Sequence, residues 1–288
     1  MPDLDAAAQF VHNNGRLLER RQFEHAFVAP DPEGVRRAID AYVNPDGGFG
    51  ALEPDVRSPA SQPSAVVYAF EVLDDLGIAA DDPVARGALD WVATIAGDDG
   101  GIPFVTYDAA SHPHAPWWTP TEDPPASLLM TAGLAAMSHR LGLHDHPWVV
   151  KATDFVWTRI GEVQLSDPYT FRYVVRFLDA VPDRDRADAE VAALAERMPD
   201  DGILKVEAGV EGETMSALEV APRPGHVGTR LFPQALVERQ LDELAAEQKD
   251  DGGWDFTWAR WNPAAAFEWR GVMTLQALTT LRAYGRLD

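Results

Sequence analysis

The sequence predicts an all-α fold built from pairs of helices. Three observations carry this prediction. A short Asp-Gly segment recurs along the chain, a stretch with helical spacing of apolar residues precedes most copies, and a more apolar stretch follows most of them. No segment alternates polar and apolar residues over enough positions to predict a long strand.

The recurring segment consists of an acid, one or two glycines and an apolar residue. Its copies lie about fifty residues apart, except for one gap of about twice that length. Because glycine adopts a left-handed backbone conformation without strain, we expect each glycine pair to end the helix before it. The copies are NPDGGFG at 44–50, GDDGGIPF at 97–104, PDDGILK at 199–205 and KDDGGWDF at 249–256, with a degenerate copy, RIGEVQL at 159–165, in the gap.

The stretches before the copies are amphipathic. They begin with residues that suit a helix cap and first turn, and their apolar residues then recur three or four apart. They are DDPVARGALDWVATIA at 81–96, HPWVVKATDFVWTRI at 146–160 and LFPQALVERQLDELAAEQ at 231–248.

The stretches after the copies are apolar on most faces, as expected of helices buried between other helices. The stretch around 209–229 lacks the helix that its repeat predicts, which indicates that the ring is incomplete or locally remodelled there. The apolar stretches are SAVVYAFEVLDDLG at 64–77, SLLMTAGLAAMSHRLG at 127–142, YTFRYVVRFLDAV at 169–181 and EWRGVMTLQALTTLRAYG at 268–285.

Composition excludes several classes of function. The net charge of −22 leaves no basic stripe for nucleic acid, and the absence of Cys excludes disulfides, thiolate metal sites and Cys nucleophiles. The first residues carry no signal-peptide pattern, and no apolar run approaches the roughly 18 residues of a membrane span. We therefore expect a soluble, cytoplasmic protein with no cofactor, and a single domain over 1–288 with repeats from about residue 31.

Gln248, Gly252 and Trp254 follow the Q-x-x-x-G-x-W pattern of the QW repeat. The upstream half of that repeat, a base, Gly or Ala, an aromatic and an aliphatic residue, matches 86–92 and 151–156. The chain thus resembles the α/α-toroid superfamily of squalene–hopene and terpene cyclases, which also includes protein prenyltransferase β subunits. The resemblance implies an α/α toroid or partial toroid with long loops capping one end. It also implies a structural role for Gln248 and Trp254 and a small hydrophobic substrate, and it leaves the oligomeric state open.

Such a fold would carry its catalytic or binding residues in the loops before the apolar helices. Three of these loops are candidates: 51–64, 104–127 and 255–271. A type II terpene cyclase protonates an alkene or epoxide with an Asp of a D-x-D-D motif, and the chain has no such motif. The nearest acids are Glu122 and Asp123, just before an apolar helix. Burial or mutual repulsion could hold one of them protonated, or both could simply favour a helix N-terminus.

Aromatic residues gather in two of these loops and predict a ligand wall, because aromatic faces stabilise cations. Adjacent Trp117 and Trp118 cannot easily share one core, so we expect at least one to face a pocket. Glu268 and Arg270 are either a polar pair facing a ligand, with Glu268 a further candidate acid, or an ordinary ion pair. The predicted binding set is Trp117, Trp118, Trp258, Trp261, Trp269, Arg270, Gln62 and Tyr169.

Other chemistries have less support. A zinc site of the prenyltransferase type needs a Cys, and the His pairs 112/114 and 144/146 have a spacing that suits a strand better than a helix. No D-D-x-x-D run indicates magnesium and diphosphate, so we expect no metal. Three hypotheses remain: a terpene cyclase or isomerase, a non-catalytic binding or scaffold protein of the same fold, and a glycosidase. A glycosidase would use two carboxylates from Glu53, Asp123, Asp255 and Glu268.

Overall fold

The computed structural model describes residues 2–78 and 80–287; its regular structure is mostly helical, and the helices are joined by several long loops. The chain divides into two compact units. The middle unit comprises residues 39–190, and the terminal unit comprises 1–38 together with 191–288. The divisions fall within α3 (Pro32–Asp40) and α9 (Arg184–Ala195).

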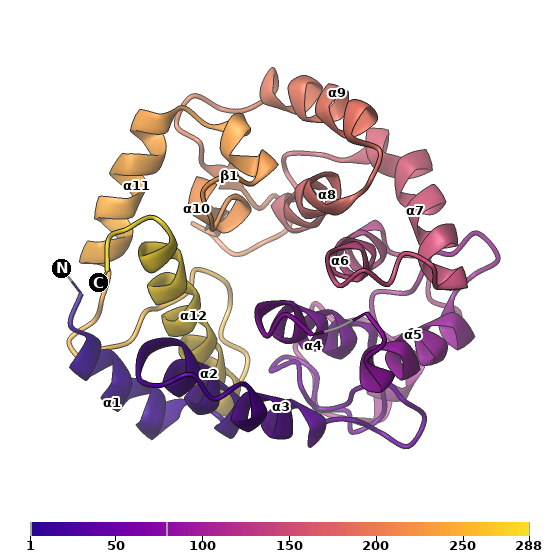
Figure 1. Ribbon diagram of the computed structural model, residues 1–288, viewed down its shortest axis with the longest axis horizontal. Helices are drawn as coiled ribbons and strands as arrows, with labels where there is room; N and C mark the ends of the chain where they lie inside the picture. The colour runs from indigo at the N-terminus through magenta and orange to yellow at the C-terminus, as the bar shows by residue number, and fades with distance from the viewer. Residues whose placement is uncertain (1, 79, 288) are drawn as a thin grey trace. The chain divides into compact units, whose positions relative to one another are not determined.

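The middle unit contains two layers of helices. Three helices, each 13 residues long, form its inner layer, with α6 between α4 and α8, and α5 and α7 lie outside them (Figure 1). All five match helices that the sequence predicts. The inner helices are α4 (Pro63–Asp75), α6 (Leu128–Arg140) and α8 (Pro168–Ala180); the outer ones are α5 (Pro83–Ile95) and α7 (Pro147–Arg159), with 3-10 turns η1 (Tyr107–Ser111) and η2 (Ile160–Glu162).

In the terminal unit, the long helix α12 (Pro263–Ala283) contacts α1 (Leu4–Asn14), α2 (Leu17–Phe27) and α11 (Gln234–Ala246). The stretch that was expected to lack its helix contains only the four-residue α10 (Ala217–Val220). Around it lie a short hairpin of β1 (Leu204–Lys205) and β2 (Thr214–Met215) and the 3-10 turn η3 (Val227–Leu231). This stretch therefore contains no helix as long as those of the middle unit.

The recurring glycines adopt the left-handed backbone conformation. The sequence predicts them at helix ends, but they lie in turns beyond the helices. Gly47, Gly100 and Gly252 have φ of 91°, 86° and 90°, and α5, for example, ends at Ile95, well before Gly100. Each instead occupies a tight turn in which the preceding acid accepts a hydrogen bond from the backbone N–H two residues on. These bonds are Asp46–Gly48 (3.0 Å), Asp99–Gly101 (3.1 Å) and Asp251–Gly253 (3.2 Å).

The glycine turns pack against the next outer helix, which leaves no room for a side chain. A Cβ on Gly47 would lie 2.6 Å from the Gly87 carbonyl oxygen of α5, and one on Gly252 would lie 2.2 Å from the Ala6 carbonyl oxygen of α1. The second glycine of each pair lies against an aromatic ring of the same outer helix. This ring belongs to the residue four positions after the one that the first glycine meets: Gly48 lies against Trp91, and Gly253 lies against Phe10. Helix α1 therefore packs against the last copy, although the sequence predicts repeats only from about residue 31.

Candidate functional site

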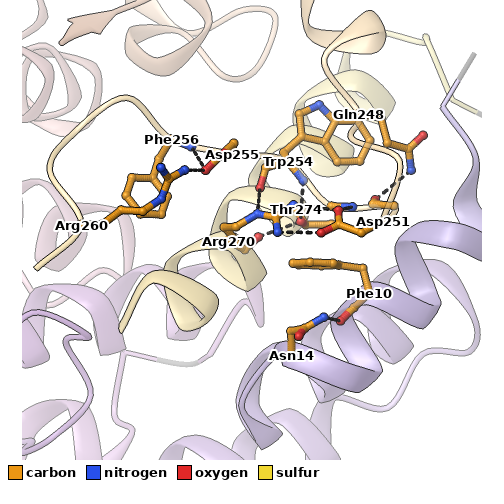
Figure 2. A network of polar contacts seen from close by, with 12 residues as sticks. Phe10, Asn14, Gln248, Asp251, Trp254, Asp255, Phe256, Arg260, Arg270 and Thr274 are labelled. Atoms are coloured by element: carbon orange, nitrogen blue, oxygen red, sulfur yellow. Dashed lines mark hydrogen bonds and ion pairs between the residues drawn. The ribbon is translucent and has the colours of Figure 1, made fainter. Parts of the chain in front are cut away.

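Arg270 holds the last glycine turn in place (Figure 2). Its Nη1 and Nη2 each donate to Asp251 at 2.7 Å, its Nε donates to the Trp254 carbonyl at 3.3 Å, and its guanidinium lies 4.5 Å from the centre of the Phe10 ring. The hydrogen bonds from Arg270 lower the pKa of the Asp251 carboxyl, and in return the pKa of Arg270 is raised. The carboxylate partner of Arg270 is thus Asp251, and the contacts fit a structural role.

Gln248 and Trp254 join the same turn to its surroundings. The Gln248 side chain accepts from the Asp3 N–H at 2.7 Å and donates to the carbonyls of Asp3 and Gly252. Trp254 is 2% exposed, and its indole N–H donates to the Leu244 carbonyl at 2.8 Å. These contacts agree with the structural role that the family resemblance implies for both residues.

The loop before α12 carries an aromatic cluster. Trp258 stacks on Phe256 with ring centres 4.4 Å apart and meets the Trp269 ring edge-on at 5.1 Å. Arg260 lies over Phe256 and pairs with Asp255. Burial raises the pKa of Asp255, but the bonds from Arg260 and from the Phe256 N–H outweigh it and lower the pKa overall. The structure thus brings together two predicted binding residues, Trp258 and Trp269, and Trp261 is half-buried in the same loop.

Glu268 lines a pocket at the start of α12. The pocket has a volume of about 370 Å³ and is open to solvent. Its other lining residues come from the turn between α1 and α2 and from α12: Asn13, Asn14, Gly15, Arg16, Ala264 and Phe267. Among the residues that the structure describes, no group of three or more His, Asp or Glu is placed to hold a metal ion.

In the middle unit, the two predicted acids lie on the surface. Glu122 and Asp123 are both exposed in the long loop 104–127. The adjacent tryptophans of this loop differ: Trp118 is 6% exposed and stacks on Phe104 at 4.2 Å, whereas Trp117 is 40% exposed. Of these two tryptophans, Trp117 is thus the one that a ligand can reach in this structure.

Gln62 and Tyr169 complete the predicted set. Gln62 is 1% exposed, and its amide is bonded to Thr106, so it joins two loops of the middle unit. Tyr169 is half-buried in the first turn of α8.

The possible glycosidase carboxylates are divided between the units, with Glu53 and Asp123 in one and Asp255 and Glu268 in the other.

Two carboxylates are buried in the loop before α4. Glu53 is 8% exposed and Asp55 is 4% exposed. The backbone around them is held against the long loop, because the Ala115 N–H donates to the Asp55 carbonyl and the Arg57 N–H donates to the Pro113 carbonyl. The sequence alone suggests Glu53 only as a possible glycosidase carboxylate and does not suggest Asp55, although both lie in a Pro-rich stretch just before an apolar helix.

A cluster of polar residues joins α4 to α8 across α6. The Tyr173 hydroxyl donates to Glu71 at 3.3 Å, and Arg176 forms an ion pair with the same carboxylate. A Cβ on Gly133 of α6 would lie 2.8 Å from the Tyr173 ring, so this glycine gives the ring room. Burial of the phenol and then the charge of Glu71 raise the pKa of Tyr173 to about 12, and Glu53 adds to this effect.

The cluster was missed in the sequence, although a signal for it exists. Arg172 and Arg176 are spaced as neighbours on one face of an otherwise apolar helix, with Tyr173 beside them. Both guanidinium groups lie over the Tyr173 ring, at 5.0 and 5.2 Å from its centre.

The fold is that of terpene cyclases. The type II terpene cyclase MstE from Scytonema, solved with its substrate geranylgeranyl dihydroxybenzoate, superposes with a TM-score of 0.59 at 14% identity, over 99% of this chain and 97% of that one. The same cyclase without ligand gives a TM-score of 0.54 at 14% identity, over 99% and 88% of the two chains. A protein from Actinoplanes gives 0.57 at 15% identity, over 98% and 89%. The predicted all-α fold of the toroid class is thereby confirmed.

The likeness extends to the fold and not to the sequence. No protein-family model matches the chain, and no curated protein matches it either. Among the helices within residues 2–78 and 80–287, none combines the length and apolar character that a membrane crossing requires.

Proposed function

We propose that the protein acts on a hydrophobic, isoprenoid-type substrate and starts a cyclisation or isomerisation by protonating it. The observation that carries the proposal is the burial of Glu53 and Asp55 in the loop before an inner helix of a terpene-cyclase fold. A carboxyl group that protonates an alkene must be shielded from water, because burial favours its neutral form and removes competing bases. Glu122 and Asp123 lie in solvent and lack this shielding.

Glu53 is the proton donor in this proposal, because its side chain is only 8% exposed in the loop just before α4. Protonation of an alkene carbon by Glu53, or of an epoxide oxygen with breakage of one C–O bond, would leave a carbocation on the substrate and a carboxylate on the protein. The cation closes a ring or shifts a bond, and loss of a proton returns a neutral product. Trp117, the exposed tryptophan of the middle unit, could stabilise the cation with its aromatic face.

The test is a product assay by gas chromatography and mass spectrometry. The purified protein is incubated with linear prenyl diphosphates and with their hydrocarbon and epoxide counterparts. We expect cyclised or isomerised products that Glu53→Gln abolishes, because an amide cannot donate this proton. The control is the double variant Glu122→Gln/Asp123→Asn, which should retain activity. Activity lost in the control and kept in Glu53→Gln would assign the acid to the exposed pair instead.

A binding or scaffold role without catalysis is the second candidate, and the absence of a D-x-D-D motif favours it. In that case no substrate is turned over, and Glu53→Gln changes neither ligand affinity nor product formation.

A further inference from the structure

The repeated glycine turns contain a chemically reactive pair of residues. Each of the four copies places an aspartate directly before a glycine, at 46–47, 99–100, 201–202 and 251–252. In such a pair the backbone nitrogen of the glycine can attack the side-chain carboxyl carbon of the aspartate, because glycine has no Cβ to hinder the approach. Each copy is therefore a candidate for isomerisation of its aspartate.

The isomerisation consumes nothing but the chain and returns the water that it releases. A new C–N bond closes a five-membered succinimide, and the carboxyl hydroxyl leaves as water with the proton of the glycine N–H. Water then adds back at one of the two ring carbonyls. Opening at the side-chain carbonyl restores aspartate, whereas opening at the main-chain carbonyl gives isoaspartate, whose backbone continues through Cβ.

One restraint is common to all four turns. The glycine N–H donates to the carbonyl oxygen two residues before the aspartate, at 2.9 Å in the first three copies and 2.8 Å in the last. This bond must break before the nitrogen reaches the carboxyl carbon, but it does not distinguish one copy from another. The differences lie in the carboxyl group and in the packing of the glycine.

The carboxylates of three copies are held by another side chain as well as by the backbone. The partners are Ser61 for Asp46 (2.8 Å), Arg159 for Asp99 (4.0 Å) and Arg270 for Asp251 (2.7 Å). The attack requires a neutral carboxyl group, since its hydroxyl is the leaving group. Arg270 lowers the pKa of Asp251 and so keeps this carboxylate ionised.

Asp201 has no comparable side-chain restraint. Within residues 2–78 and 80–287, the one hydrogen bond to its carboxylate comes from the Ile203 N–H at 3.0 Å, and the residue is exposed. Its carboxyl group can therefore turn toward the Gly202 nitrogen without breaking a contact to another side chain.

Packing distinguishes the same copy. The first glycine of each other copy lies against the backbone of an outer helix: a Cβ on Gly100, for example, would lie 2.6 Å from the Lys151 carbonyl carbon of α7. The atoms nearest to a Cβ on Gly202 belong instead to the side chains of Leu236 and Phe232. Side chains change rotamer more easily than a helix backbone moves, so this turn opens at a lower cost than the others.

We infer that Asp201 is a modification site at which the folded protein converts aspartate to isoaspartate, whereas the turns of Asp46, Asp99 and Asp251 are protected. The product carries a free carboxylate on Cα in an exposed turn, and protein isoaspartyl methyltransferases esterify this group. The extra backbone atom also lies three residues before β1, so we expect it to loosen the hairpin of β1 and β2. The inference is independent of the proposed catalysis.

Asn14 and Gly15 could follow similar chemistry with loss of ammonia, and the structure disfavours it. Asn14 is the last residue of α1, and its amide donates to the Phe10 carbonyl at 3.0 Å. In a helix the Cα–Cβ bond tilts toward the N-terminus, away from the next backbone nitrogen, so we expect this pair to react slowly. Deamidation changes the mass of a peptide, which distinguishes it from isomerisation.

The test follows isoaspartate in the purified, folded protein during incubation at neutral pH. Samples are digested, and the modified peptides are separated by liquid chromatography, located by electron-transfer fragmentation and counted by enzymatic methylation. We expect isoaspartate to accumulate at least about tenfold faster at Asp201 than at Asp251, since one charge-assisted hydrogen bond gives about that factor. In denaturant, where the turns are absent, the four rates should become similar.

Two variants remove the protection from single copies. Arg270→Gln should raise the rate at Asp251 about tenfold, because the carboxylate loses its charged donor. Ser61→Ala should raise the rate at Asp46, and it keeps the test available if Arg270→Gln does not fold. Thermal unfolding shows whether each variant is folded.

Two further variants are the controls. Arg21→Gln removes an arginine that pairs with Glu24 within α2, so all four rates should stay unchanged. Asp201→Glu should abolish the signal at its own position, because the corresponding ring has six members and closes far more slowly.

Three results would overturn the inference. The first is a rate at Asp201 no higher than at the other three copies in the folded protein. The second is the same ratio of rates in denaturant, which would assign the difference to the local sequence and not to the turns. The third is an unchanged rate in the folded variant that has lost its carboxylate partner, at Asp251 or at Asp46.

Discussion

Gln62 and Thr106 exchange two hydrogen bonds in the middle unit. The Gln62 amide N–H donates to the Thr106 hydroxyl at 2.7 Å, and the Thr106 backbone N–H donates to the Gln62 amide oxygen at 3.0 Å. Gln62 precedes α4 and Thr106 precedes η1, so this pair joins the loop that carries Glu53 and Asp55 to the long loop 104–127. With its amide occupied and buried, Gln62 holds the two loops together.

We predict that Gln62→Ala destabilises the protein by about 2 kcal/mol, because it leaves the buried Thr106 N–H without its acceptor and opens a cavity. Chemical denaturation measures the change. Gln164→Ala is the control, since Gln164 is exposed and its side chain bonds only the nearby Glu162 carbonyl. Equal stabilities of the two variants would show that the Gln62–Thr106 pair does not hold the loops.

Gly252→Ala tests whether the glycine turns are required for packing as well as for backbone conformation. Gly252 and Gly212 have nearly the same φ, 90° and 85°, but only Gly252 lies against another helix. Gly212→Ala should therefore cost about 1 kcal/mol from backbone strain alone. Gly252→Ala should cost at least about 2 kcal/mol more, because its Cβ would collide with the α1 backbone. Similar thermal shifts for the two variants would contradict this packing argument.

Gly133→Ala should displace the Tyr173 ring, at a cost of about 1–3 kcal/mol from overpacking. The cost should largely disappear in a Tyr173→Ala background, because the three atoms nearest to the new methyl group all belong to the Tyr173 ring, and a double-mutant cycle measures this difference. Gly161→Ala is the control, because a Cβ there meets no atom within 4 Å. Additive effects of Gly133→Ala and Tyr173→Ala would contradict the contact.

His139 makes the stability of the middle unit sensitive to acid. Thr153 donates its hydroxyl proton to the Val149 carbonyl, so the ring Nε2–H of His139 must donate to Thr153, at 2.8 Å. Among the described residues nothing hydrogen-bonds to the buried His139 Nδ1. Burial, and then the charge of His144, lower the pKa of His139 from 6.5 to about 4.

The His139 imidazole binds its second proton more tightly in the unfolded chain than in the folded protein. The contribution of His139 to the free energy of unfolding is therefore complete above pH 6.5 and falls as the pH drops from 6.5 to about 4. We expect a loss of about 2 kcal/mol, after a discount for the part of the ring that solvent reaches. Denaturation as a function of pH measures the slope, and His139→Gln should reduce it in this window. An unchanged slope in His139→Gln would assign the acid sensitivity to other groups.

The helices of the repeat were predictable because their signals are local. Each has apolar spacing and capping residues within its own sequence, such as Asp82 and Pro83 at the start of α5. Helix α1 was not assigned to the repeat, although Ala6 and Phe10 have the same spacing as Gly87 and Trp91. Its partner turn lies at the other end of the chain, and no local pattern joins the two.

The site was less predictable, because burial and pairing depend on the tertiary structure. Glu122 and Asp123 have the sequence position of catalytic acids but lie in solvent, whereas Glu53 and Asp55 occupy a similar loop and are buried. Arg270 is likewise adjacent to a candidate acid in sequence, and yet its carboxylate partner is Asp251. Sequence spacing limits which residues can meet, and only the fold selects among them.

The hydrogen bonds between Gln248 and Asp3, and the packing of Gly252 on α1, have a consequence for synthesis on the ribosome. The middle unit is continuous in sequence, so all of its residues are made before the later part of the terminal unit. The first 38 residues belong to a unit whose remainder begins only at Val191. The contacts of α1 with Gln248 and Gly252 therefore form only after residues 248–253 have been made, and a nascent polypeptide shorter than this leaves the Phe10 face of α1 without these contacts and open to chaperones and proteases.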